Sequence, residues 1–285
     1  MTQLITEIVH PMDKWVRPER MPHIWCPGCG LGIILTALVK ALEKIGIDKR
    51  KVCVVSGIGC AGRIAGYIRV DSFHTLHGRA IPFAIGLKLS NPEREVFVIS
   101  GDGDLFAIGG NHIIHAARRN IEITVICVNN FNYGMTGGQV GPTTPELAKA
   151  TTAPYGNIEP PFNLPYLCAS AGAVYVARWT TLHVRRMIES FVEAINKNGF
   201  SFVEVLSPCP VAFGRRNQMR EGLDMMIYFK EHSEIRNFID PKEAPIILGE
   251  KIIVGKFVDI EGKKGFTERM KELIKMARGR ALKIG

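Results

Sequence analysis

The sequence predicts an α/β protein with a doubly wound, mostly parallel β-sheet. Two observations carry this prediction. Runs of β-branched residues alternate with helical patterns from about residue 30 to 205, which is the order expected of strand–helix–strand units. The strand candidates are also almost wholly apolar, as strands are when helices bury both faces of a parallel sheet.

Each expected element follows from its local pattern. In chain order, the helical pattern LGIILTALVKALEKIG (31–46) precedes the β-branched run KVCVVS (51–56), RAIPFAIGLKLS (79–90) precedes EVFVIS (95–100), and FAIGGNHIIHAARR (106–119) precedes EITVICVN (122–129). Two further strands, AVYVAR (173–178) and SFVEVL (201–206), enclose the helical pattern TLHVRRMIESFVEAINKNG (181–199). This order indicates one α/β domain.

We expect three segments: an N-terminal arm over 1–22, the α/β domain over 23–213, and a C-terminal extension over 214–285. Beyond about residue 210 the strand patterns become short and Lys and Glu more frequent, and the chain ends in the basic helical stretch FTERMKELIKMARGRALK. We expect this extension to pack on the core or on a partner subunit.

Several classes of protein are excluded at this stage. The first 22 residues mix charge and proline where a secretory signal would have an apolar core, so we expect a cytoplasmic protein. The longest apolar runs fall well short of the roughly 18 residues of a membrane helix, so no membrane association is expected. The net charge of +9 is spread along the chain without a basic, aromatic-rich stretch, so no nucleic acid is expected as a partner. Seven cysteines without a signal sequence argue against a disulfide framework.

A glycine motif that follows the first expected strand resembles a dinucleotide-binding fingerprint. Gly57, Gly59 and Gly62 have the G-x-G-x-x-G spacing. A nicotinamide site also needs an acidic residue about 20 positions further on, and Asp71 is too close. Cys60 in the middle of the motif has no role in a pyrophosphate-binding turn. This motif is the only sequence feature that would support interpretation of the protein as an NAD-dependent dehydrogenase.

A second glycine-rich motif suits a metal-bound diphosphate. The strand 95–100 is followed by Gly-Asp-Gly, and the next strand ends in Asn-Asn just under 30 residues later. Because the carboxyl ends of neighbouring parallel strands meet in one crevice, Asp102 and Asn130 should face one point. Their oxygens suit Mg²⁺, and Gly101, Gly103 and Gly134 would let backbone N–H groups approach a diphosphate. The alternative is an ordinary turn with a helix-capping Asp.

Cys26 and Cys29, in HIWCPGCG, have C-x-x-C spacing. A thioredoxin-type redox pair needs a strand just before it, and the proline-broken WVRPERMPH cannot be one. A zinc site would need a second close pair, which the sequence lacks. Cys60 and Cys209 lie in loops after expected strands, whereas the other three cysteines lie in apolar strand or helix patterns. Four loop thiolates fit a [4Fe–4S] cluster, with a zinc-stabilised or redox binding module as the alternative.

Together these motifs resemble the β subunit of the 2-oxoacid:ferredoxin oxidoreductases. The blocks WCPGCG, SGIGCAGR, FHTLHGRAIPFAIGLKLSNP, GDGD, VNNFNYGMTGGQ and SPCP follow the family's order over residues 23 to about 215. The resemblance implies a thiamine-diphosphate-binding fold. It implies that the [4Fe–4S] cluster is ligated by Cys26, Cys29, Cys60 and Cys209. It also implies that Mg²⁺ is bound by Asp102, Asn130 and the backbone carbonyl of Asn132.

Other residues of the same motifs are expected at the cofactor. They are Asp104, next to the Gly-Asp-Gly turn, and Tyr133, Met135 and Thr136, in the NNFNYGMTGG block. His77, in FHTLHGR, would contact the cofactor or relay a proton. The alternative for His77 is a helix-capping or backbone-bonded histidine.

The resemblance also implies an activity and partners. In this family thiamine diphosphate carries the chemistry of oxidative decarboxylation of a 2-oxoacid, the cluster passes electrons one at a time to ferredoxin, and coenzyme A takes the acyl group. The glutamate that activates thiamine belongs to another subunit in the family. We therefore expect an α subunit, or α and γ subunits, as partners, with ferredoxin as the electron acceptor.

Arg63 bears on which 2-oxoacid is the substrate. It follows Cys60 by three residues, on the turn expected between cluster and thiamine, where an unpaired buried guanidinium would be costly. Family members acting on 2-oxoglutarate tend to carry a basic residue here, and an arginine can hold a distal carboxylate through two parallel N–H bonds. We therefore expect conversion of 2-oxoglutarate to succinyl-CoA, with pyruvate or a branched-chain 2-oxoacid as alternatives. In the competing interpretation, Arg63 pairs with a partner's carboxylate or balances the cluster's negative charge.

Overall fold

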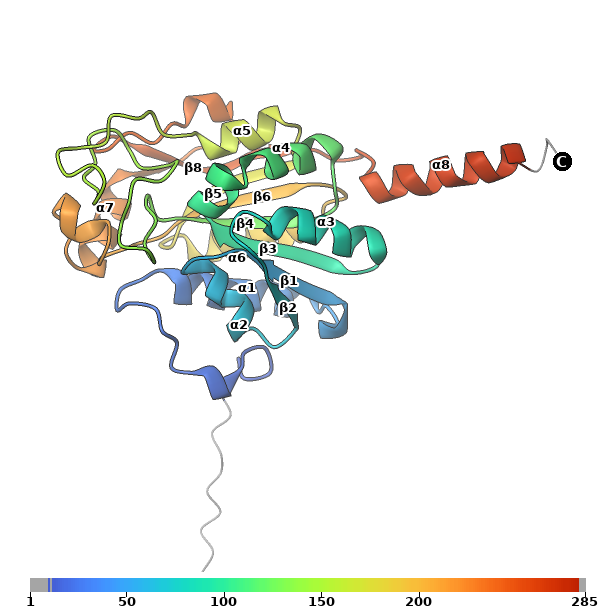
Figure 1. Ribbon diagram of the computed structural model, residues 1–285, viewed down its shortest axis with the longest axis horizontal. Coiled ribbons are helices and arrows are strands. Elements are labelled where there is room, and N and C mark those ends of the chain that lie inside the picture. Colours follow the sequence, from blue (N-terminus) through green and yellow to red (C-terminus); the bar gives the residue numbers. More distant parts are fainter. Residues whose placement is uncertain (1–9, 11, 282–285) are drawn as a thin grey trace, which may run out of the picture.

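A single eight-stranded sheet organises the protein (Figure 1). The structure, a computed structural model, describes residue 10 and residues 12–281. The strand order is β2-β1-β3-β4-β6-β5-β8-β7. The strands are β1 (Val52–Ser56), β2 (Asp71–His74), β3 (Glu95–Gly101), β4 (Thr124–Asn129), β5 (Tyr175–Thr180), β6 (Ser201–Leu206), β7 (Ser233–Ile235) and β8 (Ile252–Asp259).

Neighbouring strands run parallel throughout the sheet except at one pair. Among the strands of the described residues, β5 and β8 are the one antiparallel pair. The doubly wound, mostly parallel sheet expected from the sequence is therefore confirmed, and so are all five strands placed by their apolar runs.

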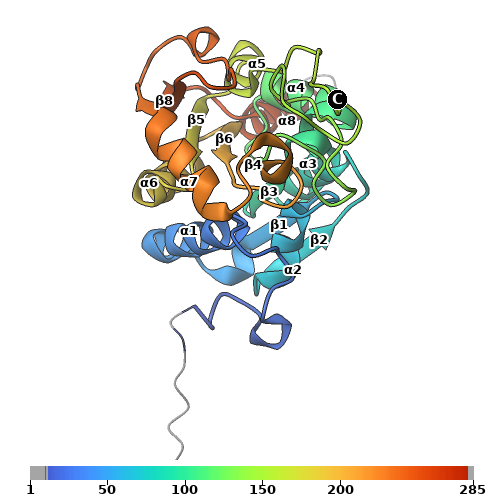
Figure 2. The same ribbon diagram turned by 90° about the vertical axis from the view of Figure 1, so that its left-hand side faces the viewer.

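Helices cover both faces of the sheet (Figures 1 and 2). α1 and α6 contribute to the core on one face, whereas α3, α4 and α5 contribute to the core on the other. The helices are α1 (Leu31–Ile45), α2 (Ile64–Tyr67), α3 (Ala80–Ser90), α4 (Gly110–Arg119), α5 (Leu164–Ser170), α6 (Val184–Ile195), α7 (Gly222–His232) and α8 (Phe266–Ala281).

The central strands are apolar because both of their faces are buried. In β1, Val52 and Val54 pack into the core beside α1, while Cys53 and Val55 pack into the core on the opposite face. Successive side chains of a strand point to opposite faces, so an uninterrupted apolar run is what two helical layers require.

The helix expected over 106–119 is shorter than its pattern. A π-helical turn occupies Gly103–Ile108, and α4 begins only at Gly110. A Cβ atom on Gly109 would lie 2.4 Å from the carbonyl oxygen of Asp104, so the chain turns too tightly there for a regular helix with a side chain. Such π-helical turns are common at functional sites.

The C-terminal segment contributes to the sheet. The expectation of short strands after about residue 210 is wrong for β8, which has eight residues and pairs with β5. The division into three segments at 22 and 213 stays a prediction, and the greater part of the N-terminal arm lies outside the described residues.

The last helix, α8, projects from the body of the protein (Figure 1). Its first turn is anchored, because the Glu122 carboxylate accepts a hydrogen bond from the backbone N–H of Thr267 at 2.9 Å. Its described side chains from residue 271 onward are exposed. Among the described residues, no helix is both long enough and apolar enough to cross a membrane.

Candidate active site

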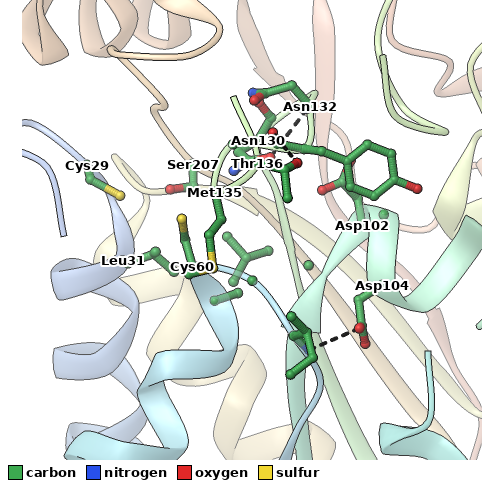
Figure 3. Close-up of a pocket in the computed structure, with 18 of the residues that line it drawn as sticks. Cys29, Leu31, Cys60, Asp102, Asp104, Asn130, Asn132, Met135, Thr136 and Ser207 are labelled. Carbon is green, nitrogen blue, oxygen red and sulfur yellow. Dashed lines mark hydrogen bonds between the residues drawn. The ribbon is translucent and has the colours of Figure 1, made fainter. Parts of the chain in front are cut away.

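A pocket lies where the parallel strands β1, β3, β4 and β6 end (Figure 3). The loops after these strands line it, together with the start of α1. All the residues expected from the sequence to bind cofactor, 101–104, 130 and 132–136, line this pocket, and so do Cys29, Cys60 and His77. The structure therefore brings these residues from several strand ends to one pocket, whereas Cys26, Cys209 and Arg63 do not line it.

Oxygen atoms gather on one side of the pocket. Asp102, directly after β3, is 2 % exposed, and burial raises the pKa of its carboxyl to about 7. Asn132 is buried too, and its side-chain oxygen Oδ1 has no hydrogen-bond partner among the described residues. The Asn132 side-chain amide donates to the backbone carbonyl of Asn130 at 2.7 Å. A desolvated carboxylate and an unpaired amide oxygen on residues that line one pocket fit a hard cation such as Mg²⁺.

Two glycines allow the loops around these oxygens to approach one another. A Cβ atom on Gly103 would lie 2.2 Å from the ring of Tyr133, so the ring packs directly on the glycine backbone. A Cβ atom on Gly134 would lie 3.4 Å from both Asn130 Nδ2 and Cys209 Sγ. Only the backbone of Gly134 therefore lies between the Asn130 side chain and the Cys209 thiol.

Asp104 acts differently from Asp102 in the structure. Its Oδ1 accepts hydrogen bonds from the backbone N–H groups of Ile58 at 3.1 Å and of Gly78 at 2.9 Å, and its Oδ2 accepts one from the Ser100 hydroxyl at 2.8 Å. Asp104 thus ties two neighbouring loops to the end of β3. His77 Nδ1 lies 2.7 Å from Asp104 Oδ1, with the side chain partly exposed at the pocket.

The three loops that carry the cysteines contact one another. The Trp25 indole N–H donates to the backbone carbonyl of Cys60 at 2.9 Å, which joins the C-x-x-C loop to the loop after β1. Within the first loop, the Cys29 N–H donates to the Cys26 carbonyl at 3.0 Å. The third loop is close as well, because a Cβ atom on Gly28 would lie 3.3 Å from the side chain of Pro210.

The four loop cysteines are near enough for their charges to affect one another. Burial, together with smaller contributions from the negative charges of Cys209, Cys60 and Cys26, raises the pKa of Cys29 to about 12. Burial also raises the pKa of Cys60, with added repulsion from Cys209 and Cys26. Four thiolates would therefore repel one another here unless metal ions balanced their charge.

The spacing of the loop cysteines suits an iron–sulfur cluster better than a single metal ion. Among the described residues, no three His, Cys, Asp or Glu side chains converge closely enough to hold a single metal ion. A four-iron cluster holds its thiolates farther apart than one ion does, because each thiolate binds a different iron. Cys26, Cys29, Cys60 and Cys209 are exposed or partly buried at the loops, whereas Cys53, Cys127 and Cys168 are buried in β1, β4 and α5.

The expectation that Arg63 is buried is wrong. Its side chain is exposed in this chain, does not line the pocket, and makes no ion pair or hydrogen bond with the described residues. Arg63 ends the 3₁₀ turn Ala61–Arg63, which directs the buried faces of Ala61 and Gly62 inward and the arginine outward. It remains near the cysteines, since its charge lowers the pKa of Cys60, although burial outweighs this effect.

Sequence reasoning missed other residues of the site. Ile58 and Ser207 line the pocket, and the hydroxyl of Thr143 donates a hydrogen bond to the Asp102 carboxylate. Thr143 lies in the long loop after β4, in the segment GPTTPE, where no periodic pattern distinguishes one threonine from the next. Adjacent strand ends could have located Ser207, which follows β6 directly.

The chain is similar to known proteins over most of its length. Residues 30–205 match the thiamine pyrophosphate enzyme family, C-terminal TPP binding domain. The 2-oxoglutarate synthase subunit KorB of Methanocaldococcus jannaschii is 51 % identical over 93 % of this chain and 98 % of its own length. The 2-oxoacid:ferredoxin oxidoreductase 2, subunit beta, of Aeropyrum pernix is 36 % identical over 88 % of this chain and 84 % of its own.

A solved structure is also similar. The 2-oxoglutarate:ferredoxin oxidoreductase from Magnetococcus marinus, with 2-oxoglutarate, coenzyme A and succinyl-CoA bound, matches with a TM-score of 0.83 at 30 % identity, over 95 % of this chain and 91 % of that one. Both the sequence identity and the fold therefore extend over nearly the whole chain. The chain belongs to the family of 2-oxoacid:ferredoxin oxidoreductase β subunits and contains their thiamine-diphosphate-binding domain.

Proposed function

We propose that this chain is the subunit of a 2-oxoglutarate:ferredoxin oxidoreductase that holds thiamine diphosphate, Mg²⁺ and a [4Fe–4S] cluster. The reaction is the oxidative decarboxylation of 2-oxoglutarate with coenzyme A to succinyl-CoA and CO₂, with two electrons passed to ferredoxin. The 2-oxoglutarate synthase subunits among the relatives support this substrate over pyruvate or a branched-chain 2-oxoacid. We also propose that the protein works in the cytoplasm.

The observation that carries the proposal is the adjacency of two donor sets in one pocket. Asp102, Asn130 and Asn132 supply oxygen atoms, and Cys29 and Cys60 supply thiols, to the walls of the same cavity. Metal-bound diphosphate suits the first set, and an iron–sulfur cluster suits the second. A cofactor that becomes strongly reducing and an acceptor of single electrons would then lie next to each other.

The residues of this chain have distinct proposed roles. Asp102, Asn130 and the backbone carbonyl of Asn132 hold Mg²⁺ on the diphosphate, and the glycine backbone at 103 and 134 lets the loops close on it. Cys26, Cys29, Cys60 and Cys209 hold the cluster. When bound, thiamine diphosphate would supply the nucleophile for the keto carbon and would take up the bonding electron pair that CO₂ leaves behind.

This chain supplies only part of the active site. The matched family is a thiamine-pyrophosphate-binding C-terminal domain, and the relatives are named as subunits. We propose that a larger α subunit, alone or with a γ subunit, supplies the glutamate that activates the aminopyrimidine. The isolated chain should therefore not turn over 2-oxoglutarate, while the complex should reduce ferredoxin.

Anaerobic purification of the complex tests the proposal. The complex should contain iron and sulfide at about four each per β chain, should bind thiamine diphosphate with Mg²⁺, and should form succinyl-CoA while reducing a low-potential viologen dye. Cys60→Ser should lose the cluster, whereas Cys53→Ala should keep it because Cys53 is buried in β1. Stoichiometric zinc without iron, or full turnover by the isolated chain, would refute the proposal.

A further inference from the structure

A buried chain of polar side chains leads through the sheet to Asp102. It begins on β5, where Arg178 Nε donates to Glu204 Oε2 on β6 at 2.6 Å. Glu204 Oε1 accepts a hydrogen bond from Asn129 Nδ2, at the end of β4, at 2.7 Å. The Arg178 and Glu204 side chains are fully buried and Asn129 is 1 % exposed. Three neighbouring strands are therefore joined by charge-assisted hydrogen bonds that water cannot reach.

The chain continues into the loop after β4. Asn129 Oδ1 accepts the backbone N–H of Phe131 at 3.0 Å and lies 2.9 Å from Thr143 Oγ1. The Thr143 hydroxyl also contacts Asp102 Oδ2 within hydrogen-bond distance. A hydroxyl has one proton to donate, and an ionised carboxylate is the stronger acceptor, so Thr143 donates to Asp102 when that residue carries its charge. Thr143 is itself 2 % exposed and has little freedom to turn away.

A fully buried ion pair needs a physical reason, because its desolvation often costs as much as the pairing returns. Arg178 and Glu204 leave few polar groups unsatisfied: Arg178 also donates to the carbonyl of Ala244 at 2.7 Å, and Glu204 uses both carboxylate oxygens. Side chains held at both ends in this way have fixed rotamers. The ion pair therefore fixes the rotamer of Asn129, whose Oδ1 lies against the Thr143 hydroxyl beneath the pocket.

We infer that Thr143 is a positioning residue that orients the Asp102 carboxylate for Mg²⁺ by donating its hydroxyl proton to that carboxylate. This inference rests on the proposed role of Asp102 as a Mg²⁺ ligand. Groups that hydrogen-bond a metal ligand fix its direction, and their removal typically weakens metal binding about 10- to 100-fold. The Thr143 hydroxyl therefore contributes to the affinity for Mg²⁺ and thereby to the affinity for thiamine diphosphate.

The neighbouring threonine provides a matched control. Thr144 is also fully buried, but its hydroxyl donates to the carbonyl of Phe131 at 2.6 Å and accepts the N–H of Gly141 at 2.8 Å. Thr144→Val therefore removes a buried hydroxyl from the same loop without removing a hydrogen bond to Asp102. A loss of stability that Thr143→Val and Thr144→Val share comes from removing a buried hydroxyl and not from the contact with Asp102.

The test measures cofactor binding by the native complex after removal of thiamine diphosphate and Mg²⁺. Titration calorimetry gives the Mg²⁺ concentration that half-saturates thiamine diphosphate binding, and thermal unfolding of the cofactor-free protein gives stability. Thr143→Val should raise the half-saturating Mg²⁺ concentration about 10- to 100-fold, Thr143→Ser should restore it to within a few-fold, and Thr144→Val should leave it unchanged. If Thr143→Val does not fold, Thr143→Ala replaces it with the same expectation.

The outcomes separate this inference from the proposed function. Wild-type Mg²⁺ dependence in the Thr143 variants, an equal loss in Thr144→Val, or failure of the serine to rescue would overturn the positioning role. Asp102→Ala distinguishes the two proposals. If Asp102→Ala leaves the Mg²⁺-dependent binding of thiamine diphosphate intact, the proposed metal site itself is wrong. If Asp102→Ala abolishes this binding while Thr143→Val leaves the half-saturating Mg²⁺ concentration unchanged, only the positioning role of Thr143 fails.

Discussion

At the scale of single residues, the two aspartates of the GDGD motif have separate tasks. Asp102 lies among the oxygen atoms of the pocket and is fully desolvated, which raises its pKa to about 7. Asp104, two residues later in the π-helical turn, accepts backbone N–H groups from two loops. The motif alone does not distinguish them, because their roles depend on how the turn rotates each side chain.

The raised pKa of Asp102 predicts how the stability of the cofactor-free protein depends on pH. The pKa of Asp102 is about 7 in the folded protein, against 3.8 for an ordinary aspartate, so the folded protein binds the proton more tightly than the unfolded chain. This stabilising contribution is fully present below the unfolded pKa and is lost as pH rises through the folded pKa. From pH 6 to 8 the wild type should lose on the order of 1 kcal/mol relative to Asp102→Asn, which cannot ionise.

Denaturant unfolding of both cofactor-free proteins at several pH values measures this difference. Saturating Mg²⁺ and thiamine diphosphate should remove the loss in the wild type, because the cation favours the ionised carboxylate. Parallel pH profiles for the wild type and Asp102→Asn would show that Asp102 keeps an ordinary pKa.

At the scale of elements, burial decides what could be predicted. The five central strands could be recognised because two helical layers bury both of their faces, as Val54 and Val55 illustrate in β1. β2, at the edge of the sheet, has mostly exposed side chains and therefore no apolar signal. β8 mixes buried and half-buried positions and contains Gly255, so its sequence does not resemble a central strand.

In the site, residues at strand ends could be predicted from the sequence, whereas residues in irregular loops could not. Asp102 and Asn130 could be brought together from the sequence because the ends of neighbouring parallel strands must meet. Thr143 could not be found, because it reaches Asp102 through a long loop without periodicity, whose path is fixed by side-chain hydrogen bonds such as Asn157 Nδ2 to the Thr144 carbonyl at 2.8 Å. The orientation of Arg63 could not be found either, because the three-residue turn Ala61–Arg63 is too short to show a periodic pattern that separates buried from exposed positions.

The glycine at the start of the π-helical turn provides a prediction at this scale. A Cβ atom on Gly103 would lie 2.2 Å from the Tyr133 ring, which would have to move away from the pocket wall. Gly103→Ala should therefore lower the free energy of unfolding by roughly 1 to 3 kcal/mol and weaken thiamine diphosphate binding. Gly110→Ala is the control, because its Cβ atom would have no neighbour within 4 Å and helix α4 should gain up to about 1 kcal/mol. Equal behaviour of the two variants in calorimetry and unfolding would contradict the role of the Gly103–Tyr133 contact.

At the scale of the whole molecule, the pocket and the loops that carry the cysteines lie at the carboxyl ends of the parallel strands. Helix α8 projects from another part of the protein (Figure 1). Arg63 is exposed in this chain and lies close enough to Cys60 for its charge to lower the pKa of that thiol. In a complex whose partner completes the active site, the surroundings of Arg63 depend on the assembly. Its role therefore has to be tested in the complex.

The two interpretations of Arg63 predict different kinetics. If the guanidinium binds the distal carboxylate of 2-oxoglutarate, Arg63→Met should lose roughly 2 to 4 kcal/mol of discrimination for this substrate over pyruvate, measured as the ratio of kcat/KM values. If Arg63 instead pairs with a partner's carboxylate or balances the cluster, kcat/KM should fall equally for 2-oxoglutarate, pyruvate and a branched-chain 2-oxoacid. Arg69→Met is the control, because Arg69 is another exposed arginine nearby in the sequence, and within the part of the chain that the structure describes its side chain would lose only a distant contact with Glu19, at 3.9 Å. A change in Arg69→Met as large as that in Arg63→Met would assign the effect to overall charge and not to a specific contact with the substrate.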